Sequence, residues 1–262
     1  WTGVVSTPVD IRAGAIGEST TYISVRRNEA TGTGTASAGS AFSGGGSSYD
    51  IAGHDIVYAW NSVHDFGVWQ SATENDTHGF GVGSNHYNNW YLWNTAYHNS
   101  GDGIGNGHDA NHKTYNLYIG GNHLYENREN AIDLKEVHNV VMSENDMHGY
   151  VPRDSSEGAA MVIHYGPTGG QGPYNTWTIN NKIYDSTVGY AGSDVENGNY
   201  IIGNIFYNID KAIALNNTGG GSYYVYHNTI NNSGVGEWWG VTTDVLDVAG
   251  NIVANTTSGA HM

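Results

Sequence analysis

The segment ENAIDLKEVHNVVMSEND, residues 129–146, decides how the chain folds. Its apolar residues follow neither the spacing of a helix nor the plain alternation of an isolated half-buried strand. Ile132 and Leu134 alternate with Asp133 and Lys135, and Asn145 stands ten residues after the lysine. An architecture that repeats such a segment must explain both the alternation and the asparagine.

An asparagine within an apolar, β-branched segment recurs along most of the chain. The repeated positions are Asn61, Asn94, Asn122, Asn145, Asn181, Asn204, Asn228 and Asn251. Their successive spacings are 33, 28, 23, 36, 23, 24 and 23 residues. Four of these seven intervals lie within one residue of 23, so the chain is a repeat protein with insertions in three repeats.

The period and composition of the repeat favour a coil of three short parallel strands per turn. A period of 23 is too short for a propeller blade, and the β-branched, aromatic segments with Gly-Asn turns do not suit helical repeats. The dense leucine pattern of leucine-rich repeats is also missing. In a coil, asparagines at one register form a ladder at a corner, each amide bonding the next.

These repeats resemble those of the right-handed parallel β-helix proteins of the pectate-lyase-like superfamily, over roughly residues 50–255. The resemblance predicts an all-β, single-domain parallel β-helix of about eight or nine coils. Residues 1–50 are less regular, and we expect a degenerate first coil and an N-terminal cap there, because an open strand edge invites aggregation. We interpret residues 51–255 as the β-helix, and residues 256–262 as a cloning remnant.

Composition limits the classes of function. The 262-residue chain carries 9 Lys and Arg against 25 Asp and Glu, a formal charge of −16, so it lacks the basic face of a nucleic-acid binder. It has no cysteine and no apolar stretch long enough to span a membrane. We expect a monomer that is secreted, extracellular or periplasmic in a bacterium, and whose signal peptide is absent from this sequence, with Ca²⁺ as a candidate cofactor.

The asparagines serve as a ruler for the outward-facing residues. Counting from them places Ile132 and Leu134 in the core and Lys135 outside, with His164 at the same register one coil on. The complete predicted column is Gly83, Gly107, Lys135, His164, Asp194 and Asn216. Two glycines beside ionisable groups suggest a flat floor for a sugar ring. The surplus residues of the long repeats, including HDANHKTY, residues 108–115, surround this column as expected cleft walls.

The same segments are similar to those of the lyases that include chondroitinase B and several alginate lyases. That similarity implies β-elimination at a uronate: a cation neutralises the carboxylate, and a base then removes the proton beside it. The family's strand lysine matches Lys135, whereas its arginine and the following histidine are His164 and Tyr165 here; Tyr165 and His112 are further catalytic candidates. We expect Lys135 as base and His164 as neutraliser or proton donor, with Asp133 beside them; the reverse assignment is open, because acidic neighbours raise the pKa of a lysine.

Other roles and functions stay open on the sequence alone. His108 and His112 are expected at the substrate, and Asp109 and Glu129 are candidate metal ligands. A glycoside hydrolase on the same scaffold would need two suitably spaced carboxyl groups, for which Asp109 with Asp133 is better placed than Asp133 with Asp194. A non-catalytic glycan-binding or tail-spike-like module is the third class. In each case the partner is a polysaccharide or oligosaccharide.

Overall fold

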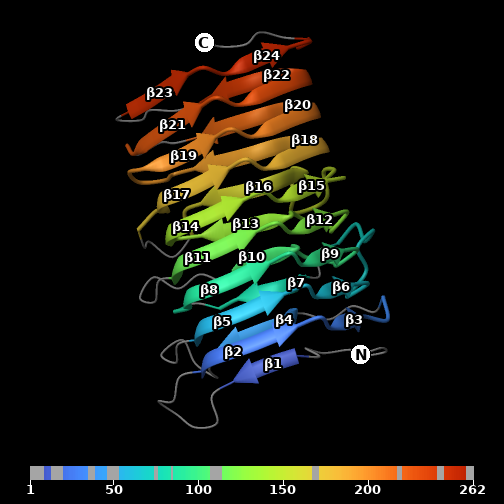
Figure 1. Cartoon of the computed structure of the whole chain (residues 1–262). Helices are drawn as coiled ribbons and strands as arrows, with labels where there is room; N and C mark the ends of the chain where they lie inside the picture. Colours follow the sequence, from blue (N-terminus) through green and yellow to red (C-terminus); the bar gives the residue numbers. More distant parts are fainter. Residues whose placement is uncertain are drawn as a thin grey trace.

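A computed structural model describes residues 9–12, 20–34, 39–45, 53–73, 76–83, 85–106, 114–166, 171–216, 220–240 and 245–257. The described residues form an all-β parallel β-helix, as the sequence predicted, in which the strands stack from the N-terminal to the C-terminal end (Figure 1). Every strand pair is parallel. No helix that could cross a membrane occurs in this part of the chain.

Two sheets run along the stack. The nine-stranded sheet consists of β2 (Thr20–Arg26), β5 (Gly53–Ala59), β8 (Tyr87–Leu92), β11 (Thr114–Gly120), β14 (Val137–Ser143), β17 (Tyr174–Ile179), β19 (Asn199–Ile202), β21 (Ser222–Tyr226) and β23 (Val245–Ala249). The fifteen-stranded sheet starts with two separate columns of short strands. One column is β3 (Glu29–Thr31), β6 (Ser62–His64), β9 (Thr95–Tyr97), β12 (His123–Tyr125) and β15 (Asp146–His148). The other is β1 (Val9–Arg12), β4 (Gly39–Gly45), β7 (Thr77–Val82), β10 (Ile104–Asn106), β13 (Ile132–Lys135) and β16 (Ala159–His164).

The two columns of the larger sheet merge towards the C-terminal end. There β18 (Lys182–Ser193) and β20 (Ile205–Asn216) each run through both columns as one long strand, followed by β22 (Thr229–Trp239) and β24 (Ile252–Ala254). In the earlier coils a bend separates the columns, for example between β12 and β13. The chain therefore turns sharply in the N-terminal part of the sheet and runs straighter in the C-terminal part.

The predicted asparagine ladder lies at the corner between the two sheets. The Oδ1 of Asn122 accepts hydrogen bonds from the backbone N–H and the Nδ2 of Asn94, at 2.8 and 3.1 Å. The Nδ2 of Asn122 donates to the Tyr91 carbonyl at 2.8 Å. The same pattern links all eight predicted asparagines and extends to Asn28, which the repeat count did not include. These buried amides are satisfied because each one bonds to the adjacent coil.

The residue before each ladder asparagine explains the Gly-Asn turns of the sequence. At this corner the backbone takes a positive φ, which glycine adopts without the steric cost of a Cβ atom. Gly121, Gly203 and Gly250 occupy this position with φ of 66°, 69° and 68°. The other coils place larger residues there, including Trp60 and Trp93, whose rings stack with centroids 4.9 Å apart.

Inward side chains of successive coils stack into one core. Ile104, Ile132 and Met161 are in register on three neighbouring strands, and all are fully buried. Leu134 is in register with Ile163. The predicted inward positions of residues 132 and 134 are thus confirmed, and each coil buries the apolar face of the next.

The described part of residues 1–50 also belongs to the stack. β2 pairs with β5, and β1 pairs with β4 in the same parallel manner. Residues 1–8 and 13–19 lie outside the described residues, so the predicted cap stays a prediction. The predicted remnant at 256–262 overlaps the described chain at Thr256 and Thr257, and the Thr257 N–H bonds to the Ser233 carbonyl at 3.1 Å.

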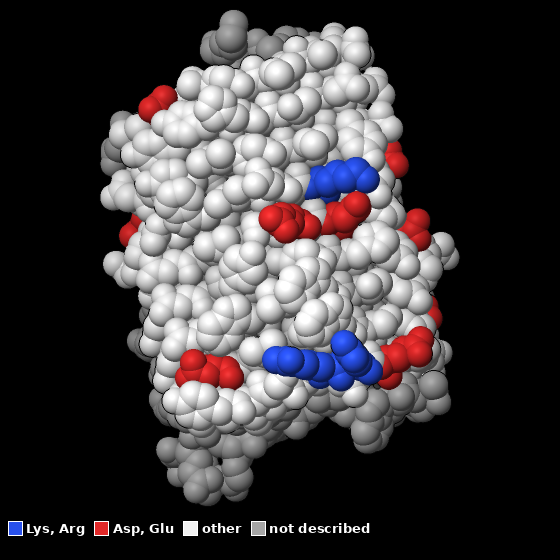
Figure 2. All heavy atoms as spheres, viewed as in Figure 1, with Lys and Arg blue, Asp and Glu red and all other residues white. Residues whose placement is uncertain are grey.

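The acidic excess of the chain is sparse on the face shown in Figure 2. Most of that face is uncharged, and its Lys and Arg side chains form two small groups, each adjoining acidic side chains. The described residues of this face form no continuous basic area of the kind that binds a polyanion.

Candidate functional site

A groove crosses the outer surface of six strands, β7, β10, β13, β16, β18 and β20. Its volume is about 900 Å³. Its lining includes Asp76, His78, Asp102, Asn106, Glu129, Asn130, Asp133, Lys135, Ser155, Ser156, Glu157, His164, Ser193, Lys211 and Asn216. The groove spans several coils, so a polymer lying in it would cross the strands. It contains the predicted Lys135 and His164.

Lys135 and His164 share a carboxylate at the floor of the groove. The two residues are directly in register on β13 and β16, as predicted. Asp133 Oδ1 lies 3.1 Å from His164 Nε2, while Oδ2 accepts a hydrogen bond from Lys135 Nζ. The side chains are 25% exposed for His164, 22% for Lys135 and 11% for Asp133. A buried carboxylate thus fixes a cation and an imidazole side by side.

Electrostatics within this trio define the charge of two members. Burial alone would raise the pKa of Asp133, but the hydrogen bond from His164 and the charge of Lys135 outweigh it and lower that pKa. Burial would lower the pKa of Lys135, yet the charges of Asp133 and Asp102 raise it overall. Lys135 is therefore a stable cation at neutral pH. This favours the second of the two assignments, in which His164 rather than Lys135 is the base.

The bond to Asp133 also orients the imidazole of His164. An ionised carboxylate can only accept hydrogen bonds, so Nε2 carries the proton in this contact. The neutral ring then has its basic lone pair on Nδ1. A carboxylate that holds one nitrogen protonated and leaves the other basic is the arrangement that general-base histidines use.

A second group of charged residues lines the groove. Counting positions from the repeated asparagines did not predict this group. His78 Nδ1 lies 3.2 Å from Asp102 Oδ2 and 3.5 Å from Asp76 Oδ1. The other oxygen of Asp102 accepts the backbone N–H of Asn130 at 3.0 Å. Gly105 follows the buried Ile104 on β10, and a Cβ on it would come within 2.7 Å of the Asp102 carboxylate. The absence of a side chain there makes room for this pair.

The two acids raise the pKa of His78. Burial lowers the pKa of His78, but the hydrogen bond and charge of Asp102, with the charge of Asp76, raise it to about 9. Burial and the charge of Asp133 in turn raise the pKa of Asp102, and His78 opposes this. His78 lies on β7, two coils from Lys135, which corresponds to about 10 Å along the stack. The groove therefore holds two cationic centres at separate positions.

A break in the strand alternation explains why the sequence did not reveal His78 and Asp102. Alternation back from the buried Phe80 would turn residue 78 inward. Instead Gly79 also faces the core, since a Cβ on it would lie 3.0 Å from Val63. Gly103 before Ile104 repeats this arrangement. Because two consecutive residues face inward, the residues before them face outward where strict alternation would turn them inward. In the sequence, only the glycines that follow His78 and Asp102 indicated this break in the alternation.

Glu129 lines the groove and contacts Arg128 and Ser155. Its Oε1 is 2.8 Å from Arg128 Nη1 and accepts the hydroxyl of Ser155. Arg128 is almost completely buried. Burial and the charge of Asp102 raise the pKa of Glu129 to about 7, although the Ser155 hydrogen bond and Arg128 act in the opposite direction. Glu129 can therefore exchange a proton near neutral pH.

The remaining described members of the predicted column have different positions. Asn216 lines the groove, whereas Gly83 and Asp194 are absent from its described lining, as is the separate catalytic candidate Tyr165. The predicted register of Asp194 is wrong: Ser193 pairs with both His164 and Asn216. Asp194 follows with φ of 47°. It corresponds to Glu136, which follows Lys135 with φ of 54°, and the extra residue falls in the next turn.

Four predicted residues, Gly107, His108, Asp109 and His112, lie outside the described residues, so their roles stay predictions. The described carboxylates of the groove fit calcium poorly. Ca²⁺ takes six to eight oxygen ligands, whereas the compact group around Asp102 contains an imidazole nitrogen and only two carboxylates. Glu129 already binds Arg128 and Ser155.

Fold and groove together define a parallel β-helix protein with a polar groove across its coils. A search of solved structures finds a similar chain, the A-module of the mannuronan C-5 epimerase AlgE6 of Azotobacter vinelandii, with a TM-score of 0.60 and 20% sequence identity. The similarity covers 88% of this chain and 58% of that one. At this identity the likeness establishes the fold alone. No protein-family model and no curated protein matches the sequence.

Proposed function

We propose that the protein is an enzyme that removes the C-5 proton from uronate units of a polysaccharide, and that β-elimination follows. The observation that carries the proposal is the shared carboxylate of Lys135 and His164 at the groove floor. Asp133, Lys135 and His164 together supply the two groups that the reaction needs: a fixed cation for the substrate carboxylate and an oriented base beside it. The named activity of the structural neighbour, on a uronate polymer, agrees with this class of substrate.

The proposed steps balance without a further reactant. Lys135 binds the uronate carboxylate, which makes the neighbouring C-5 proton more acidic. His164 Nδ1 takes that proton, the C–H electron pair forms the C4=C5 double bond, and the bond from C-4 to the glycosidic oxygen breaks. The imidazolium then gives the proton to the leaving oxygen. His78, two coils away, is assigned to the carboxylate of another sugar unit because it lies too far along the stack for the same one.

C-5 epimerisation is the second candidate, favoured by the activity named for the structural neighbour. It shares proton abstraction with elimination, but a proton must return to C-5 from the opposite side of the ring. Glu129 is the candidate donor, because its pKa of about 7 provides a protonated carboxyl group in the groove. Hydrolysis with Asp133 as the general acid is disfavoured, since its lowered pKa keeps that carboxylate ionised.

Incubation with polymers of mannuronate, guluronate, galacturonate and glucuronate-containing glycans in D₂O tests the proposal. Elimination produces ultraviolet absorbance from the unsaturated sugar, and epimerisation produces deuterium at C-5 without that absorbance. Both outcomes support C-5 proton abstraction and the first alone supports a lyase. New reducing ends without either signal, or binding without turnover, contradict the proposal and indicate a hydrolase or a glycan-binding module.

Two variants of Lys135 separate its possible roles. If Lys135 acts as a cation, Lys135→Arg retains turnover within roughly tenfold because arginine stays charged, whereas Lys135→Met loses it. A lysine that acts as the base would lose activity equally in both variants. His164→Gln is expected to lower kcat by about 10²- to 10⁴-fold, the usual contribution of a general base. His138→Gln, on β14 of the other sheet and outside the described lining of the groove, is the control for surface effects.

A further inference from the structure

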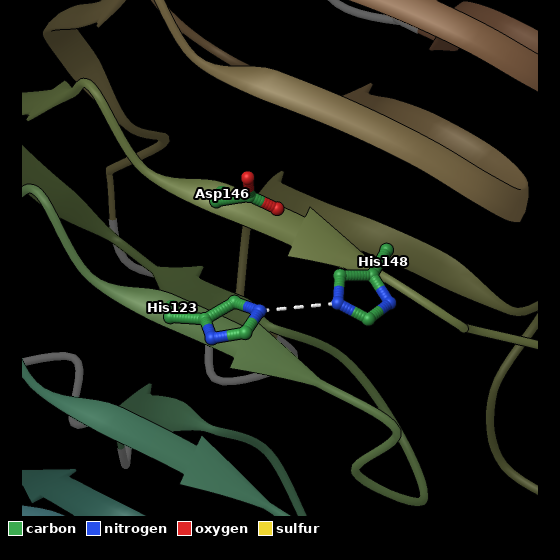
Figure 3. A group of neighbouring side chains, drawn as sticks. All are labelled: His123, Asp146 and His148. Atoms are coloured by element: carbon green, nitrogen blue, oxygen red, sulfur yellow. Dashed lines mark hydrogen bonds between the residues drawn. The ribbon is translucent and has the colours of Figure 1, made fainter.

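A cluster of two histidines and an aspartate lies on the other column of the larger sheet, on β12 and β15. His123 is in register with Asp146, and His148 is the next outward residue along β15. Leu124 and Met147 between them face the core. Figure 3 shows the three side chains on the outer side of the two neighbouring strands. None of the three is among the described residues that line the groove.

The two imidazoles of this cluster face each other through their Nε2 atoms, which lie 3.1 Å apart (Figure 3). The potential ligand atoms of His123, His148 and Asp146 all lie within 4.8 Å of one another. Two nitrogens that bind one metal ion at about 2.0–2.1 Å are roughly 2.9–3.4 Å apart for angles between 90° and tetrahedral. The observed separation falls within this range.

The surroundings hold His148 in one orientation. Its ring is stacked between Tyr125 and Tyr184, with centroid distances of 5.1 and 4.6 Å. This clamp fixes the ring plane and directs one edge towards His123. A side chain that is held in one orientation beforehand loses little conformational freedom when it binds a metal ion.

Asp146 provides the third donor. Its Oδ2 lies 3.3 Å from Lys182 Nζ. Its Oδ1 is buried, and among the described residues no hydrogen-bond donor reaches it. Buried carboxylate oxygens normally have partners, so this atom is an exception that needs an explanation. A cation bound at this oxygen would satisfy it.

We propose that His123, His148 and Asp146 form a binding site for a divalent transition-metal ion such as Zn²⁺. Two imidazoles and one carboxylate are a donor set that suits Zn²⁺, Ni²⁺ or Cu²⁺, whereas Ca²⁺ and Mg²⁺ prefer oxygen ligands. The site joins two adjacent coils, so the ion ties them together. Binding to the folded state alone raises thermal stability.

Titration of the chelator-treated full chain with Zn²⁺, followed by calorimetry, tests the site. We compare the wild type with His123→Ala and with His148→Phe, which removes the ligand but retains an aromatic ring between the two tyrosines. His138→Phe is the matched control, since His138 is likewise stacked between two tyrosines at 4.9 and 4.8 Å.

The wild type and the His138→Phe control are expected to bind one more equivalent of Zn²⁺ than the other two variants, or to bind it at least tenfold more tightly. Zn²⁺ should also raise the unfolding temperature of the first two proteins by several degrees more than that of the others. Ca²⁺ at the same concentration should not compete. Equal binding by all four proteins, no binding by the wild type, or displacement by Ca²⁺ would overturn the proposal and leave a simple histidine–histidine hydrogen bond.

Discussion

At the scale of single residues, the groove is organised by carboxylates that set the protonation of their neighbours. Asp133 stabilises the charge of Lys135 and orients His164. Two coils away, Asp102 keeps His78 protonated. In both places a group with little solvent access carries charge only because an opposite charge compensates its burial. The acids of the groove therefore define which neighbouring groups act as cations.

The raised pKa of His78 predicts a pH-dependent part of the stability. A folded-state pKa of about 9, above the unfolded value of about 6.5, contributes stability that is complete below pH 6.5 and is lost as pH rises to 9. The loss is at most about 3 kcal/mol. Denaturant unfolding of the wild type between pH 6 and 9.5 should show this decline, and His78→Gln should lack it. An NMR midpoint below 7 for the His78 ring would contradict the assignment.

At the scale of the elements, the coils are connected by their corner asparagines. Each amide replaces the hydrogen bonds that a tight corner cannot make within its own coil, and it links strands that are distant in the sequence. The stack then behaves as a series of neighbouring units. An interior asparagine of the ladder, here called a rung, bonds to the coils on both sides, whereas a terminal rung bonds to fewer.

Removing an interior rung should cost more than removing a terminal one. Asn122→Ala leaves the Asn94 N–H and the Tyr91 carbonyl without their buried partner, which predicts a loss of about 3 kcal/mol in unfolding free energy. Asn251→Ala, in the half-exposed last rung, should lose about 1 kcal/mol, because water can replace the missing bonds. Chemical denaturation measures both values. Equal losses would argue against the burial explanation.

At the scale of the whole molecule, the groove and the net charge act on a polyanion in opposite directions. The chain has a formal charge of −16, so it repels an acidic polymer at long range. Lys135, His78 and Lys211 provide cationic contacts at short range in the groove. Salt screens exposed charges that are separated by more than a Debye length, which is about 30 Å at 0.01 M and about 10 Å at 0.1 M. Partly buried contacts are screened much less.

The turnover of a uronate polymer should therefore increase with moderate salt. We expect kcat/KM to rise several-fold between about 0.01 and 0.1 M NaCl as the long-range repulsion is screened. A short uronate oligomer, which carries fewer charges, should show a smaller rise. Steady-state rates at constant pH measure the effect. A steady fall of kcat/KM for the polymer with rising salt would contradict this, because it would mean that attraction to the groove cations governs binding.

The sequence by itself determined the coil, the ladder and the pairing of Lys135 with His164. Each of these follows from two regularities: side chains alternate within β13 and β16, and an asparagine stands at a constant corner of the coils. Counting from the corner fails once the turn length changes. One extra residue after β18 put Ser193, rather than Asp194, in line with His164.

The tertiary structure alone decided the rest of the groove and the second histidine cluster. His78 and Asp102 face the groove because Gly79 and Gly103 reverse the strand parity, and this reversal depends on how the glycines pack against neighbouring coils. His123 and His148 meet because their coils are stacked in a particular register. Such contacts join residues that are far apart in the sequence, and only the packing of one coil on the next brings them together.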